Sequence, residues 1–69
     1  MKDKYRFVII PGKGRLRLKT RKIKVNGRED LNVAKVRYND MWYIFNLDTE
    51  RILSQGVTWG RVLEQVKQL

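Results

Sequence analysis

Basic side chains at a two-residue spacing are the feature of this sequence best suited to binding chemistry. Between residues 13 and 24, seven of twelve side chains are Lys or Arg and none is acidic. Leu16, Leu18 and Thr20 alternate with four of these basic residues, which is the period of a β-strand with one buried and one solvated face. We therefore expect an ordered strand that carries a stripe of positive charge.

Positive charge is concentrated in the N-terminal part of the 69-residue chain. Residues 1–28 contain eleven basic residues and one acidic residue, a net charge of +10, whereas residues 29–69 contain five basic and six acidic residues, a net charge of −1. Like charges packed this closely repel one another and oppose folding. Protection of an edge strand against aggregation explains a few lysines but not this excess, so we expect an anionic partner that compensates the repulsion.

Nucleic acid is the anionic partner that we favour. A stripe of Lys and Arg gains affinity for it by releasing condensed counterions, and a two-stranded ribbon is thin enough to enter a DNA major groove about 12 Å wide. We predict a non-catalytic nucleic-acid-binding module that uses a basic β-hairpin, with duplex DNA favoured over RNA. The predicted binding residues are Lys13, Arg15, Arg17, Lys19, Arg21, Lys22, Lys24, Lys35 and Arg37.

Two aromatic residues, Trp42 and Tyr43, bear on the choice between duplex and single strands. Exposed aromatic side chains stack the bases of single-stranded nucleic acid. Trp42 and Tyr43 lie in the most apolar run of the chain, residues 41–47, where we expect both to be buried. That expectation favours duplex DNA or structured RNA.

Other partners remain open at this point. A basic face can dock on an acidic protein, which is our alternative function. Attachment to anionic lipid is disfavoured because the basic segment is predicted to be a strand and not an amphipathic helix, so we expect no membrane partner. The oligomeric state is undetermined, and a homodimer is compatible with the sequence. We expect a cytoplasmic location from the absence of Cys and of a signal-like apolar run, and the small size would suit a phage or prophage accessory protein.

Catalytic chemistry is restricted by the residue types that are missing. The chain has no His and no Cys, which removes histidine general bases, the usual nucleophile pairs and standard zinc sites. The segment Gly12-Lys13-Gly14 is too short for a phosphate-binding P-loop and lies between two predicted strands. Asp48 and Glu50, with Asp40 nearby, are weak candidates for Mg²⁺, because acidic residues in turns are ordinarily solvated. We expect no enzyme activity, no metal and no cofactor.

The elements that position these residues are predicted to form a single, mostly β domain with one C-terminal helix (β-β-β-β-β-α). Strands are expected at residues 5–10, in the basic segment after the turn at 11–14, and at 31–38, 41–47 and 51–54. Asn26-Gly27 predicts the hairpin after the basic strand. In that strand the apolar positions change from even to odd numbers, which predicts a β-bulge at residues 21–22.

A helix is predicted after Gly56, because the apolar spacing changes there to the helical period. Thr58 is the expected N-cap. The apolar stripe, which we expect to pack on the sheet as core, consists of Trp59, Val62, Leu63, Val66 and Leu69. The expected architecture is a small antiparallel sheet, or an SH3-like barrel, packed by this helix.

The order of these elements resembles three known kinds of domain. Residues 39–49 and the helix from Thr58 resemble the strand-turn-strand-helix of integrase arm-binding domains, which use a three-stranded sheet on DNA. The same stretch, with residues 54–58 entering the helix, is also similar to HicB-type antitoxin domains. The five-strand-plus-helix plan is similar to small archaeal chromatin proteins of SH3-like fold. These resemblances assign no site residue.

Overall fold

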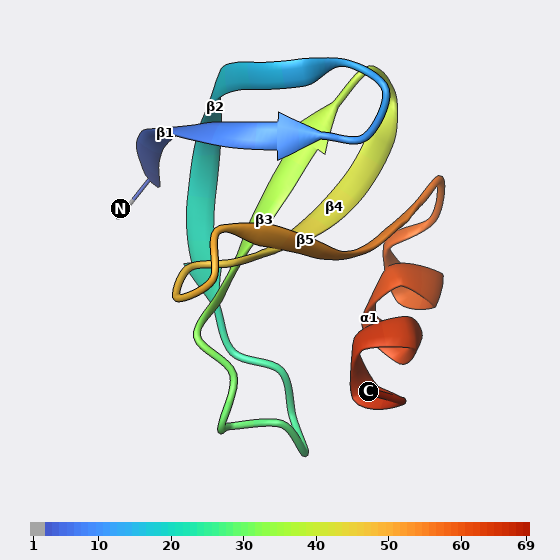
Figure 1. The fold of residues 1–69 in the computed structure, drawn as a ribbon. Coiled ribbons are helices and arrows are strands. Elements are labelled where there is room, and N and C mark those ends of the chain that lie inside the picture. Colours follow the sequence, from blue (N-terminus) through green and yellow to red (C-terminus); the bar gives the residue numbers. More distant parts are fainter. Residues whose placement is uncertain (1–2) are drawn as a thin grey trace.

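One curved antiparallel sheet followed by a helix makes up the structure (Figure 1), a computed structural model that describes residues 3–69. The elements are β1 (Asp3–Ile10), β2 (Gly14–Ile23), β3 (Val33–Tyr38), β4 (Met41–Asn46), β5 (Arg51–Gly56) and α1 (Trp59–Lys67). The strands pair in sequential order, from β1 at one edge to β5 at the other. The predicted fold class is confirmed. Within residues 3–69 no ladder joins β1 to β5, so the sheet is open and not a closed barrel.

Two of the turns are tight enough to set the register of the strands they join. Asn39 and Asp40, between β3 and β4, have φ angles of 53° and 63°, as a type I′ hairpin turn requires. Between β1 and β2 the chain turns through Gly12, whose φ of 82° suits glycine. The Lys13 N–H closes this turn by donating to the Ile10 carbonyl at 2.9 Å.

The Asn26-Gly27 pair forms a turn, but it does not join β2 and β3 as a two-residue hairpin. The Arg28 N–H donates to the Val25 carbonyl at 2.9 Å within a longer connection, residues 24–32. Val25 is buried with side chains from β3, β4 and α1. The chain therefore leaves the sheet before the turn, because burying Val25 beneath the helix favours the longer path.

Apolar side chains form two clusters, one on each face of the sheet. The buried members of the cluster inside the curved sheet are Val8, Ile10, Val36, Tyr43 and Phe45. The buried members of the cluster between the sheet and α1 are Val25, Val33, Ile44, Val62 and Val66. The Ser54 hydroxyl in β5 donates to the carbonyl of Val62 at 3.0 Å and links the helix to the sheet.

The predicted β-bulge at residues 21–22 is wrong. The register between β2 and β3 is continuous as far as Ile23. Leu18 packs inside the curved sheet, whereas Ile23 packs against the cluster beneath α1. The change in parity thus reflects two cores on opposite faces and not an extra residue. The register shifts instead between Ile44 and Phe45, where β4 pairs with β5.

The helix lies where the sequence places it, with two differences in detail. Thr58 is the N-cap residue, yet in the described part of the chain its side chain makes no capping hydrogen bond. Val62 and Val66 are fully buried, and Trp59 packs beside them. Leu69, which the apolar stripe predicts to be in the core, is instead 63% exposed, because α1 ends at Lys67 and the stripe is not continued.

Candidate nucleic-acid interface

Strand β2, which lies between the edge strand β1 and β3, orients its side chains to two sides of the sheet. Leu16 and Leu18 pack inside the curved sheet. Thr20 is buried there as well, and its hydroxyl donates to the Lys4 carbonyl of β1 at 3.0 Å. Since consecutive residues of a strand point to opposite faces, the basic residues between these positions project from the outer side.

The strand β3 continues this outer surface. Arg21 of β2 lies directly opposite Lys35 in the register, and Arg37 follows two residues later on the same side. We use the term basic face for the six outward cations of these strands, Arg15, Arg17, Lys19, Arg21, Lys35 and Arg37. Neither β2 nor β3 contains an acidic residue. Asp3, at the start of β1, is the register partner of Arg21 at one end of the face.

The edge strand β1 adds three exposed apolar side chains beside the basic face. Tyr5 and Ile9 are each 60% exposed and Phe7 is 55% exposed. Val8 and Ile10, which alternate with them along the strand, are buried. We call Tyr5, Phe7 and Ile9 the apolar column. Its members lie directly opposite Lys19, Arg17 and Arg15, respectively. The apolar column and the cations of β2 therefore form one surface.

The two arginines of β2 nearest the apolar column lie over its aromatic rings. The guanidinium carbon of Arg15 is 4.1 Å from the centroid of Phe7, and that of Arg17 is 5.3 Å from the centroid of Tyr5. Each arginine contacts the ring diagonal to it in the ladder, since its direct partner is the next residue of the column. These distances lie within the range of a cation–π interaction.

A second group of cations and rings extends the surface across β3 and β4. The guanidinium carbon of Arg37 lies 4.6 Å from the centroid of Trp42, and Lys35 Nζ lies 5.3 Å from the same ring and 5.4 Å from that of Trp59. The two indole centroids are 5.4 Å apart. A shallow hollow of about 250 Å³ joins Trp42 and the two β3 cations to Lys19 and Arg21.

The expectation that Trp42 and Tyr43 are both buried is half right. Tyr43 is buried inside the curved sheet, but Trp42 is only partly buried and borders the basic face. Neighbouring residues of a strand face opposite sides. Tyr43 therefore reaches the closed core, whereas Trp42 lies on the side that α1 covers only in part.

Three of the predicted binding residues lie away from the basic face. Lys13 is exposed in the turn between β1 and β2. Lys22 is one residue out of phase with the outward cations and lines a cavity of about 160 Å³ with residues on the other side of the sheet, including Lys4 and Arg6. Lys24 lies beyond the end of β2, where it borders a hollow that also contains Glu29.

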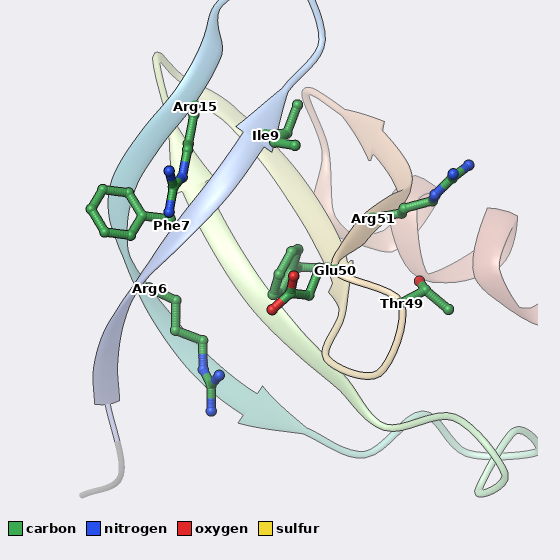
Figure 2. Close-up of a pocket in the computed structure, with 8 residues that line it drawn as sticks. Arg6, Phe7, Ile9, Arg15, Thr49, Glu50 and Arg51 are labelled. Carbon is green, nitrogen blue, oxygen red and sulfur yellow. The ribbon is translucent and has the colours of Figure 1, made fainter.

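A groove of about 490 Å³ borders the apolar column on the side of β5. It is lined by Arg6, Phe7, Ile9, Arg15, Phe45, Thr49, Glu50 and Arg51. Figure 2 shows the Arg15 side chain extending toward Phe7, and Glu50 between β1 and the start of β5. The groove places one carboxylate among three guanidinium groups, so positive charge exceeds negative charge there as well.

The acidic residues that are weak Mg²⁺ candidates in the sequence do not all lie together. Asp40 is in the turn before β4, whereas Asp48 and Glu50 are in the turn after it, so the length of β4 separates them. Asp48 accepts a hydrogen bond from Asn32 Nδ2 at 3.2 Å. Among residues 3–69 the structure contains no group of three His, Cys, Asp or Glu side chains placed to hold a metal ion.

Comparison of this chain with protein-family models, with curated proteins and with solved structures gives no match. The three resemblances of element order therefore carry no part of the functional argument. No helix in the described part of the chain has the length and apolar character needed to cross a membrane.

The apolar column is the part of the surface that sequence reasoning missed. Five of the six residues from Tyr5 to Ile10 are apolar, so the strand has no polar face to mark its exposed side. The spacing of Tyr5 and Phe7 matches that of the β2 cations, but only the pairing of β1 with β2 brings the two sets together.

Proposed function

We propose that this chain binds nucleic acid through the basic face and acts by binding alone. The observation that carries the proposal is the convergence of six cations from two adjacent strands on one side of the sheet, with no acidic residue in either strand. Arg and Lys arranged in this way neutralise successive phosphates and release their counterions. A clustered stripe of positive charge is the usual electrostatic feature of a nucleic-acid-binding domain.

The basic face offers two kinds of phosphate contact. Its arginines present planar guanidinium groups that hold a phosphate through two hydrogen bonds, whereas its lysines act as point charges. The cations project from strands in one sheet, so their spacing is set by the backbone and little ordering is needed on binding. A strand of basic residues with this rigidity suits recognition of a phosphate backbone better than recognition of one small anion.

The salt dependence of binding tests this proposal. Fluorescence anisotropy should show binding to labelled oligonucleotides of about 12 residues, supplied as duplex DNA, single-stranded DNA and single-stranded RNA. If about five phosphates are engaged, log K should fall against log salt with a slope of about −4.5 on duplex DNA and about −3.5 on single strands.

A pair of charge-reversal variants separates the basic face from net charge. Arg15→Glu with Arg17→Glu should reduce affinity by about a hundredfold or more. The same double variant should make the plot of log K against log salt less steep by about two units. Arg61→Glu with Lys67→Glu changes the net charge equally on the exposed side of α1, and it should retain most of the affinity. Absence of binding to all three oligonucleotides would refute the proposal and leave an acidic protein as the partner to test.

A further inference from the structure

The exposure of the apolar column is not explained by a partner that contacts only the cations of the basic face. Three of the five large hydrophobic side chains that are exposed in the described chain lie on this one strand face. Contiguous exposed apolar surface in a small protein marks an interaction site. The partner must therefore offer flat or apolar surface as well as negative charge.

A second copy of this chain is a poor occupant for that surface. Two copies placed face to face would bring Arg15 and Arg17 of each against the same residues of the other, in a protein whose net charge is +9. Like charges in a desolvated contact oppose association. The cations that cover the rings thus disfavour self-association and select an anion.

We propose that the partner is single-stranded nucleic acid, with bases stacked on Tyr5 and Phe7 and phosphates along Arg15, Arg17 and Lys19. This inference rests on the proposed function, and it replaces the duplex expected from the sequence with a single strand as the form of the nucleic acid. Bases in a duplex are paired and stacked inside it, so their flat faces are not available to a sheet surface. A single strand offers both groups at once, since its bases can be splayed out onto aromatic rings or guanidinium planes.

The spacing of the surface supports the same choice. Tyr5 and Phe7 are two residues apart in a strand, which separates them by about 6.6 Å. Bases that remain stacked on each other are about 3.4 Å apart. Two neighbouring bases therefore cannot each stack on one of these rings while they stay stacked together, which excludes a continuous helix and suits an extended strand.

The neighbouring strand β2 places its cations close enough to the aromatic rings of β1 to contact the phosphates of nucleotides whose bases lie on those rings. β2 lies about 4.8 Å from β1 in the sheet, and its cations at 15, 17 and 19 are the register partners of the apolar column. A nucleotide whose base covers Phe7 thus has its phosphate within reach of Arg15 or Arg17. The guanidinium over one side of each ring leaves room for a base, because both aromatic residues remain more than half exposed.

The test compares Phe7 variants that differ only in the aromatic ring. The probes are a dT oligonucleotide and a rU oligonucleotide of about 12 residues, and a mixed-sequence duplex of equal length. The wild type should bind both single strands more tightly than the duplex. Phe7→Leu keeps an apolar side chain but loses the ring, and should weaken single-strand binding by about tenfold, the loss expected for one stacked base.

Two further variants complete the design. Phe7→Trp retains a ring and should restore single-strand affinity to within about twofold of the wild type. Val57→Ala removes an exposed apolar side chain far from the column in sequence, in the segment between β5 and α1, and should change nothing. Circular dichroism checks that each variant remains folded. The salt slope should be unchanged by Phe7→Leu, because loss of a stacking ring releases no counterions.

The possible outcomes distinguish this inference from the proposed function. Binding of duplex as tightly as of single strands would overturn the single-strand inference and leave nucleic-acid binding intact. Equal single-strand affinity of Phe7→Leu and wild type would also overturn the single-strand inference without affecting the proposal that the chain binds nucleic acid. If neither single strand nor the duplex is bound, both proposals fall. The dT and rU probes also show whether the 2′-hydroxyl contributes.

Discussion

The guanidinium carbon of Arg15 lies 4.1 Å from the ring centroid of Phe7, across the ladder that joins β2 to the edge strand β1. This contact joins a cation of the basic face to the apolar column. An edge strand with exposed apolar residues invites pairing with other chains, and charge beside it is a common protection. The same arrangement leaves a ring and a cation side by side for a ligand that carries both a base and a phosphate.

Position on the sheet, and not basic character alone, should decide which cations bind. Arg15→Ala with Arg17→Ala should lower affinity for a single-stranded oligonucleotide by about tenfold or more. Lys22→Ala with Lys24→Ala removes the same charge from positions off the basic face. This double variant should lower the affinity for the same oligonucleotide by only about twofold. Anisotropy titrations at one salt concentration compare the two. Equal losses would show that net charge governs binding.

Tryptophan emission should report occupation of the β3 side of the basic face. Trp42 lies 4.6 Å from the Arg37 guanidinium carbon, so a phosphate held by Arg37 and Lys35 changes the surroundings of that indole. The emission change on binding should persist in Trp59→Phe and become smaller in Trp42→Phe, where only Trp59, 5.4 Å from Lys35 Nζ, remains to report the phosphate. A change carried entirely by Trp59 would place the ligand elsewhere, and no change in the wild type would confine the interface to β1 and β2.

The part of the outer face that α1 covers and the part that it leaves open should differ sharply in their tolerance of truncation. Ile44 is fully buried beneath α1, whereas Ile9 is 60% exposed in the apolar column. Ile44→Ala should lower the free energy of unfolding by about 2–5 kcal/mol. Ile9→Ala should change it by about 0.5 kcal/mol or less. Urea unfolding followed by circular dichroism measures both. A large loss for Ile9→Ala would mean that β1 depends on this side chain for packing.

An ion pair in the connection between β2 and β3 should give a small, pH-dependent contribution to stability. Arg28 Nε lies 3.0 Å from Asp30 Oδ1, and Arg28 also donates to the carbonyls of Val66 and Leu69 at the end of α1. The hydrogen bond from Arg28 lowers the pKa of Asp30. Because a lowered carboxyl pKa stabilises the fold only while the group is ionised, the contribution is present above about pH 3.9 and is lost in stronger acid.

Asp30→Asn tests this contribution through the melting temperature. At pH 7 the variant should melt slightly below the wild type, since the exposed pair is weakened by solvent. The difference should disappear at a pH below the folded-state pKa of Asp30, where the wild-type carboxyl is also uncharged. If the difference in melting temperature is the same at pH 7 and below the folded-state pKa of Asp30, the effect comes from the neutral hydrogen bond or from the backbone of the connection.

Local patterns in the sequence account for the order of the elements. The change from a two-residue to a helical period places α1, and the Asn39-Asp40 turn is visible in the residue types alone. The same alternation that predicts β2 also predicts which of its cations share a side. These features depend on residues close together in the chain, so they can be read without the tertiary structure.

The surface beside the basic face depends on contacts between distant segments. Ile23 and Leu18 are apolar members of one strand, but only the tertiary structure shows that they belong to different cores. The sequence around Phe7 is apolar on both faces, so periodicity cannot tell which side is exposed.

Element order, charge asymmetry and the alternation of cations along β2 all follow from residues that are close together in the chain. Three features depend on contacts between distant segments: which apolar side chains lie outside the two cores, the open sheet between β1 and β5, and the position of Trp42 beside the cations of β3. Periodicity records only how neighbouring residues alternate, whereas the exposure of a side chain depends on which distant segment covers its face of the sheet. Phe7 remains exposed because β1 is an edge strand and α1 covers a different part of the sheet.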